Sequence, residues 1–441
     1  MNKQSFLVLI ARKLPPFVKH SIHYLFEQKF RRYHNPIKIP KFYLKWLAPN
    51  LAVYVYWVSL PLFYFFKRKG YIFLTNNITN SPGHVMPELD YFFRRTRCVS
   101  DVQNRYVVIW PRSEISHGAK IAYEKHVYKF IVSDLVFVLM HPFLIRFPEL
   151  TIDCGISIVD RSRSRCINYG FKYLPLLKEG RKEFEENWNI LYQYYKLRRM
   201  QHDYFPLYVE FQIDQKLLTF IENSKKYVVI QIKDIVGNGT AKSIDPYSYL
   251  DAIVFFQTAG YKIIFAGREK MPALFNDFGV INYSEWKFSN FFYDLQLIYN
   301  AELVISSASG FSYLADTMQI PLVYANQWNF VCPPAGLYTV IVPTLFMHNQ
   351  NTPWKFTDQI DYFYERKDSN TAIPVNLNPR NASSEEILEG AKEALELKRQ
   401  FKAMSSLQMD FHVLFPNTPL EMAESRISQF FIEKFKSSLH K

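Results

Sequence analysis

The chain has 441 residues, of which 49% are hydrophobic and 17% aromatic, and it contains only 14 glycines. These values exclude disordered, collagen-like and glycine-linker proteins and indicate a folded, aromatic-rich chain. A chain of this length exceeds the size at which one hydrophobic core usually keeps growing, so two domains with an extension are expected.

The net charge of +13 is concentrated at one end. Residues 1–70 hold thirteen Lys and Arg residues and one acid, Glu27, so the rest of the chain carries about +1. The basic residues of this arm alternate with aromatic and aliphatic residues at helical spacing, which favours an anionic lipid surface as the partner. Nucleic-acid binding and a simple solvated face are the alternatives.

Two segments of the arm are predicted to seek a membrane. Phe17 to Tyr33 has the spacing of an amphipathic basic helix. Trp46 to Phe66 is an uncharged run of 21 residues, long enough for a helix to cross a hydrocarbon layer of about 30 Å. Because Pro49 and Pro61 interrupt it, a re-entrant or interfacial hairpin and a buried helix leading into the first strand are equally open.

The cysteines and the N-terminus point to a cytosolic body. Cys98, Cys154, Cys166 and Cys332 form no CxxC pair and have no histidine at zinc-ligand spacing, so neither a metal knuckle nor a disulfide framework is expected. The short apolar run that begins at Phe6 has no small-residue cleavage site, so no cleavable signal peptide is expected.

After Gly70, short β-rich runs alternate with helical ones, which indicates parallel sheets built from βαβ units. The strands expected in the first half are Tyr71 to Thr75, Tyr106 to Trp110 and Leu135 to Met140. A charged helical stretch from Leu176 to Arg199 and a turn at His202 to Pro206 mark the domain boundary.

The second half predicts a doubly wound sheet with helices between the strands. The expected strands are Tyr227 to Ile232, Tyr261 to Ala266, Leu303 to Ser306 and Pro321 to Ala325. The expected helices are Tyr247 to Thr258, Asn290 to Asn300 after a capping Ser289, and Phe311 to Met318. Two tail helices follow, one at the capping box Ser383 to Glu386 and one at Thr418 to Glu421.

In such a sheet the ligand lies outside the carboxyl ends of the strands. The residues that follow the four strands of the second half are Lys233 and Asp234, Gly267 to Glu269, Ser306 to Gly310, and Asn326. The serine-rich turn joins a strand to a helix, whose N-terminus attracts a diphosphate. Gly310 lets the ligand approach the backbone, and Ser307 and Ser309 can donate hydrogen bonds; an ordinary capped helix is the alternative.

Lys233, Arg268 and Lys242 could neutralise charge on a leaving nucleotide, which is how glycosyl transfer proceeds without a metal. The chain has no Asp-x-Asp pair of the kind that holds Mg²⁺ or Mn²⁺ on a diphosphate, so no metal and no cofactor are expected.

In the first half, a turn at Ser81 to His84 precedes a helical pattern and would face the acceptor. His84, Glu88 or Asp90 could take the proton from an attacking hydroxyl, and His84 has the best-suited unperturbed pKa. A purely structural Gly-His turn is the alternative.

The order and spacing of these motifs resemble a family of bacterial glycosyltransferases of surface-polysaccharide assembly, distantly like the heptosyltransferases. The resemblance covers roughly Tyr71 to Phe431. It is best at Tyr227 to Asp234, Asp245-Pro246-Tyr247, Gly260-Tyr261, Gly267-Arg268, Ser309-Gly310 and Pro321 to Asn326. The tail pattern Ser425 to Ser428 adds to it, as does Gly83-His84 with Glu88 and Asp90. It implies the GT-B fold, with two Rossmann-like domains facing a cleft. It also implies nucleotide-sugar donors, lipid-linked glycan acceptors and a location on the cytoplasmic side of the inner membrane.

The predicted domains are a membrane-seeking extension (1–70), an acceptor domain (71–205), a donor domain (206–380) and C-terminal helices (381–441). Lys233, Lys242 and Asn282 stand where the family pattern has two arginines and an aspartate. Since lysine cannot form a bidentate guanidinium clamp, a non-catalytic, membrane-associated scaffold with the same fold is the alternative function.

Overall fold

The computed structural model describes residues 60–75, 82–97, 105–110, 129–132, 136, 140, 148–153, 191–202, 213–224, 226–233, 244–328, 334–348, 352–359, 362, 377–413 and 419–439. The predicted amphipathic helix Phe17 to Tyr33, most of the uncharged run that begins at Trp46, and residues Asp234 and Lys242 lie outside these ranges.

The first half contains a four-stranded parallel sheet in the order β3-β2-β1-β4. Its elements are α4 (Leu60–Arg68), β1 (Tyr71–Thr75), α5 (Pro82–Arg97), β2 (Arg105–Trp110), β3 (Lys129–Val132), η5 (Pro148–Leu150) and β4 (Thr151–Asp153). Residues 191–200 form a further helix, which overlaps the C-terminal part of the predicted charged stretch.

Two predictions for this half are wrong. The run predicted as the third strand contains Val136 and Met140, which are helical, and the strand lies earlier, at Lys129–Val132. A continuous apolar run does not distinguish a buried strand from a helix. The predicted turn at Ser81 to His84 is already helical from Pro82, because proline fits the first position of a helix.

The second half contains a seven-stranded parallel sheet in the order β13-β10-β9-β8-β5-β6-β7. Its strands are β5 (Tyr227–Gln231), β6 (Lys262–Phe265), β7 (Ile281–Asn282), β8 (Leu303–Ser306), β9 (Leu322–Gln327), β10 (Thr339–Pro343) and β13 (Arg426–Ile427). The four strands predicted for this half are confirmed, and three more extend the sheet at its two edges. A separate antiparallel pair joins β11 (Leu345–Met347) to β12 (Asn378–Arg380).

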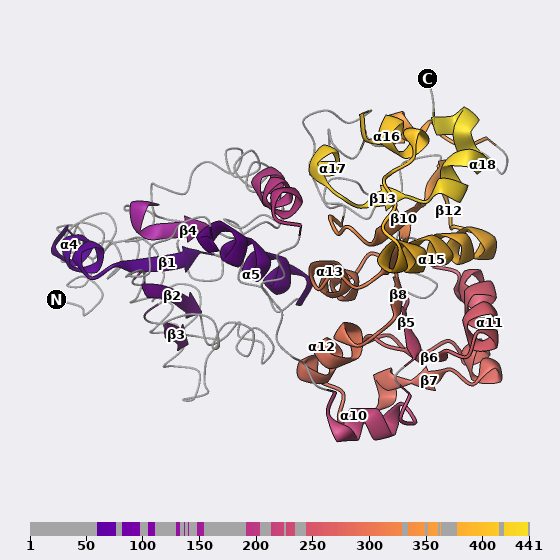
Figure 1. The fold of residues 1–441 in the computed structure, drawn as a ribbon, viewed down its shortest axis with the longest axis horizontal. Coiled ribbons are helices and arrows are strands. Elements are labelled where there is room, and N and C mark those ends of the chain that lie inside the picture. The colour runs from indigo at the N-terminus through magenta and orange to yellow at the C-terminus, as the bar shows by residue number, and fades with distance from the viewer. Residues whose placement is uncertain are drawn as a thin grey trace, which may run out of the picture.

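Helices cover both faces of the larger sheet (Figure 1). The helices described in this half are α10 (Gln215–Phe220), η8 (Pro246–Tyr249), α11 (Leu250–Thr258), η9 (Ala273–Phe278), η10 (Tyr283–Glu285), α12 (Phe291–Tyr299), α13 (Gly310–Thr317), α15 (Ser384–Arg399), α16 (Ser406–Val413), α17 (Pro419–Met422) and α18 (Gln429–Leu439). α11 and α15 lie on one face, and α12 and α13 lie on the other.

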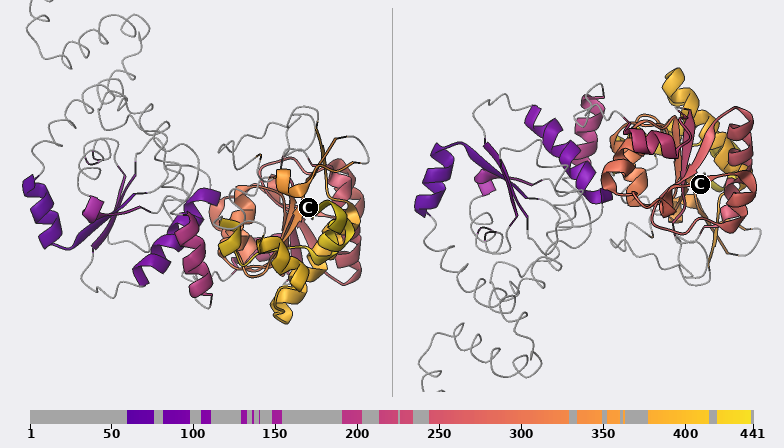
Figure 2. Two further views of the ribbon diagram at one scale, coloured as in Figure 1. Left: turned by 90° about the horizontal axis from the view of Figure 1, so that it is seen from above. Right: turned by 90° about the horizontal axis from the view of Figure 1, so that it is seen from below.

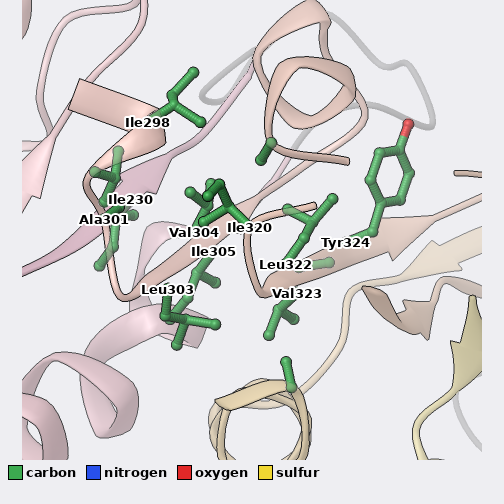
Figure 3. Close-up of a cluster of buried hydrophobic side chains, with 14 of the residues drawn as sticks. Ile230, Ile298, Ala301, Leu303, Val304, Ile305, Ile320, Leu322, Val323 and Tyr324 are labelled. Atoms are coloured by element: carbon green, nitrogen blue, oxygen red, sulfur yellow. The ribbon is translucent and has the colours of Figure 1, made fainter. Parts of the chain in front are cut away.

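Burial on both faces of the larger sheet explains why its central strands are continuous apolar runs. Every residue of β5, β8 and β9 is buried, and Figure 3 shows Ile230, Val304 and Val323 packed among their neighbours. Strands covered by helices on both sides read as continuous rather than alternating apolar runs. The capping box at Ser383 and Glu386 is confirmed at the start of α15, whereas α12 is capped by Asn290 and not by Ser289.

A buried charged cluster joins the two halves where α5 and the helix of residues 191–200 meet α13 (Figures 1 and 2). The Arg198 guanidinium donates to an Asp316 carboxylate oxygen at 2.6 Å and to the Asp316 carbonyl at 2.9 Å. Asp316 also accepts from the backbone N–H groups of Ala335 and Gly336 and from the Thr339 hydroxyl.

On the other side of this cluster, the Asp90 carboxylate accepts from the Arg94 guanidinium at 3.0 Å and from the Tyr194 hydroxyl at 2.8 Å. Both ion pairs are almost fully buried. The described part of the chain contains no helix long and apolar enough to span a membrane.

We predict that Asp316→Asn lowers the free energy of unfolding by about 3–5 kcal/mol, because the Arg198 charge would stay buried without its counter-ion. Glu396→Gln is the control: Glu396 and Lys402 are each 56% exposed, so losing this pair costs less than about 1 kcal/mol. Urea unfolding of both variants measures the difference. Equal losses would contradict the structural role of Arg198 and Asp316.

Candidate functional site

The order of the strands defines a crevice in the larger sheet. The chain runs from β5 to β6 and β7 on one side and returns to β8, β9 and β10 on the other. The connections that leave the carboxyl ends of β5 and β8 therefore diverge, and ligands of open parallel sheets bind at such a switch point.

The buried side chain of Gln231, at the end of β5, crosses this switch point. Its carbonyl oxygen accepts hydrogen bonds from the hydroxyls of Ser306 at 2.8 Å and Ser309 at 2.7 Å. The Lys233 backbone N–H donates to the Ser307 hydroxyl at 2.9 Å. These bonds hold the end of β5 against the turn that connects β8 to α13.

Gln231 also reaches the end of β6. Its amide group donates to the Glu269 carboxylate at 3.5 Å, and the same carboxylate oxygen accepts the Arg268 backbone N–H at 3.2 Å. Gly267 has φ of +113°, and a Cβ there would lie 3.0 Å from Gln231 Cγ. A glycine at this position thus allows Gln231 and Glu269 to meet.

The serine turn is built as a helix cap. The Ser309 hydroxyl accepts the backbone N–H groups of Phe311 and Ser312 and forms a capping box with Ser312. The two hydroxyls predicted to donate to a ligand therefore hold the turn: Ser307 binds the Lys233 backbone and Ser309 binds Gln231. Ser309 and Gly310 are half-buried, so the start of α13 is accessible at the carboxyl edge.

Two cations follow the strands on one side of the turn, since β5 and then β6 lie next to β8. Lys233 is half-buried after β5, and Arg268 is exposed after β6. The positive charge of Arg268 acts on Asp294, a carboxylic acid of α12 that accepts the Tyr283 hydroxyl at 2.9 Å. Burial raises the pKa of Asp294 to about 6, while the Tyr283 hydrogen bond and the Arg268 charge oppose that shift.

Asn326 has a structural contact at the end of β9. It adopts a left-handed backbone conformation with φ of +58°. Its side-chain oxygen accepts the Ala382 backbone N–H at 2.7 Å, which links β9 to the residues before α15. Asn326 is buried, and its role in donor binding stays a prediction.

The three acceptor-side candidates lie on α5, which packs against α13. His84 is the third residue of α5, and its side chain is outside the described atoms. Glu88 and Asp90 are fully buried, and Asp90 belongs to the charged cluster with Arg94 and Tyr194. These contacts give Asp90 a structural role, and its role as a base stays a prediction.

The sequence prediction included Ser307, Ser309, Lys233 and Arg268 but gave no role to Gln231 or Glu269. A polar residue at the end of the buried apolar run of β5 was the available signal for Gln231. The residues that the structure describes contain no group of three or more His, Cys, Asp or Glu side chains placed to hold a metal ion.

No protein-family model and no curated protein matches the chain. Solved structures similar to it include a family 9 glycosyl transferase from Veillonella parvula, 12% identical, which covers 74% of this chain and 97% of its own with a TM-score of 0.44. The E. coli ADP-heptose LPS heptosyltransferase II is 13% identical, and the match covers 75% of this chain and 99% of the heptosyltransferase, with a TM-score of 0.40.

The Methanocaldococcus jannaschii UDP-GlcNAc 2-epimerase, solved with UDP-GlcNAc and UDP, is 11% identical. The match covers 75% of this chain and 98% of the epimerase, with a TM-score of 0.27. The first two matches are proteins of the kind that the sequence resembles. All three TM-scores lie below 0.5, so a function for this chain has to be supported by its own contacts.

We predict that Gly267→Ala lowers the free energy of unfolding more than Gly279→Ala does. Gly279 has φ of +62° and open space around it, so its alanine variant suffers only the backbone penalty of about 1–2 kcal/mol. Gly267→Ala adds the clash with Gln231. Urea unfolding compares the two variants. Equal decreases in the free energy of unfolding would show that the Gln231 side chain can move away from the added Cβ without cost.

We also predict a pH-dependent difference between the wild type and Asp294→Asn. Protonation of Asp294 stabilises the folded state below pH 6, because its pKa is about 6 when folded against about 3.9 when unfolded. This stabilisation is lost as the pH rises from about 4 to about 7. Over that range the free energy of unfolding of Asp294→Asn therefore rises relative to that of the wild type by up to about 3 kcal/mol. Urea midpoints measured across that range test it, and a constant difference would contradict it.

Proposed function

We propose that the chain is a glycosyltransferase that moves a sugar from a nucleotide-sugar donor to a hydroxyl of a lipid-linked or surface-polysaccharide acceptor. The observation that carries the proposal is the polar cluster of Gln231, Ser306 and Ser309 at the switch point between β5 and β8. The accessible start of α13 and two cations adjoin it.

The start of α13 suits the donor diphosphate. Its dipole favours negative charge, and Gly310 presents no side chain to block the approach. Ser307 and Ser309 hold this turn in place through Lys233 and Gln231, so the site is organised before the donor arrives. Lys242 and Asp234 follow β5 in the sequence and are proposed as further donor contacts.

The chemistry needs a stabilised leaving group and a base. The acceptor oxygen attacks the anomeric carbon as the bond from that carbon to the diphosphate oxygen breaks, and the nucleoside diphosphate leaves with the electron pair. Lys233 and Arg268 would stabilise the negative charge that develops on it, so the proposed reaction needs no metal ion or cofactor. The acceptor hydroxyl loses its proton to a base, for which His84 is proposed.

The proposed architecture is GT-B, with the acceptor bound between the two sheets on the side of α5. Contact between α5 and α13 supports it, because this contact brings the helix that carries His84 to the helix that begins at Gly310. We further propose a location on the cytoplasmic side of the inner membrane, where lipid-linked acceptors are made.

We predict that one nucleoside diphosphate among UDP, GDP, ADP and CDP raises the melting temperature of the full-length protein. A ligand that binds only the folded state stabilises it by about 2.7 kcal/mol at a hundredfold excess over its Kd. Arg268→Ala and Lys233→Ala would remove most of this shift, and it would persist in EDTA.

Lys262→Ala is the matched control. Lys262 lies at the amino end of β6, whereas Arg268 follows the carboxyl end of the same strand, and Lys262 pairs with Glu222 on the surface. Its variant should keep the full nucleotide shift. Absence of any shift in the wild type would favour the non-catalytic scaffold, and equal effects of Arg268→Ala and Lys262→Ala would move the site away from the carboxyl edge.

A further inference from the structure

Helix α4 packs on the smaller sheet through one face. Phe63 is buried, and the Phe66 ring contacts the rings of Tyr71 and Phe73 edge-on, at centroid distances of 5.6 and 5.1 Å. Tyr71 and Phe73 belong to β1, so this face of α4 is part of the folded body. Figure 1 shows α4 at the end of the smaller sheet that lies away from the larger one.

The opposite face of α4 is apolar and exposed. Tyr64 is 65% exposed and Phe65 52%, and Leu60 and Leu62 are also exposed. In the described part of the chain, four of the eleven exposed large hydrophobic side chains lie in this nine-residue helix. Such a concentration marks a surface that is covered by another body.

The charges around α4 identify what covers it. Lys67, Arg68 and Lys69 are exposed at its C-terminal end, and residues 60–70 contain no acid. The residues before α4 extend this bias, since Glu27 is the only acid in the first 70 residues. An apolar and aromatic face edged by cations complements an anionic lipid surface.

We propose that α4 lies in the plane of an anionic bilayer surface, with Tyr64 and Phe65 among the lipid headgroups and Arg68 and Lys69 against their phosphates. Phe63 and Phe66 hold the helix on β1, so residues 60–68 dock on the membrane from outside and are not the end of a spanning helix. The inference goes beyond the proposed transfer reaction and does not depend on it, because binding to lipid needs no donor.

Co-sedimentation of the full-length protein with phosphatidylcholine vesicles, with and without phosphatidylglycerol, tests this proposal. The wild type should bind the anionic vesicles, and the double variant Tyr64→Ser/Phe65→Ser should bind them at least about tenfold more weakly. Tyr247→Ser/Phe401→Ser is the control, since these side chains are 63% and 58% exposed far from α4 in the sequence, and it should bind like the wild type. Circular dichroism confirms that each variant is folded.

A second variant, Arg68→Ser/Lys69→Ser, leaves the apolar face intact and should lose the preference for anionic vesicles. Inorganic phosphate should not displace the protein, because a free phosphate offers no apolar surface. Undiminished binding of Tyr64→Ser/Phe65→Ser would overturn the proposal, as would equal binding of the wild type to neutral and anionic vesicles. Full displacement by phosphate would assign the cations to a phosphate-ion site instead.

Discussion

The buried ion pair between Arg198 and Asp316 fixes α13, and the candidate site depends on that helix. Asp316 lies in the last turns of α13 and accepts from Arg198, from two backbone N–H groups and from the Thr339 hydroxyl. A Cβ on Gly336 would lie 2.5 Å from an Asp316 carboxylate oxygen, so a glycine is needed for the loop to reach it. The opposite end of α13 carries Ser309 and Gly310.

The parallel sheet then determines where polar groups can gather. Its strands are buried on both faces, so polar side chains within them must find partners there or lie at the edge. Gln231 satisfies this requirement by binding Ser306 and Ser309 across the switch point and Glu269 beyond it. One buried amide therefore connects three strand ends around the place where a donor is proposed to bind.

Much of the larger sheet was predictable because its central strands are continuous, mostly apolar runs separated by recognisable helices. Leu303–Ser306 agrees with the prediction at both ends, and the capping box at Ser383 placed α15. The edge strands were not predictable: Ile281–Asn282 and Arg426–Ile427 have two residues each, too short for any periodicity. Val136 and Met140 were wrongly predicted as part of a strand, because an apolar run without alternation fits a buried helix as well as a buried strand.

The site was predictable only at the level of the backbone. The rule that ligands bind at the carboxyl ends of strands selected Arg268 and the serine turn. It could not show that Ser307 and Ser309 hold the turn, or that Asp90 pairs with Arg94, because those contacts join residues distant in sequence or depend on side-chain direction. Gln231 was missed because its partners lie 75 and 78 residues away.

Binding of a nucleoside diphosphate at the turn between β8 and α13 is tested most directly by a crystal structure of the complex. We expect diphosphate oxygens within hydrogen-bond distance of the backbone at residues 308–310, with the Arg268 guanidinium on the same group. A nucleotide bound elsewhere, with the Gln231 cluster facing only solvent, would contradict it.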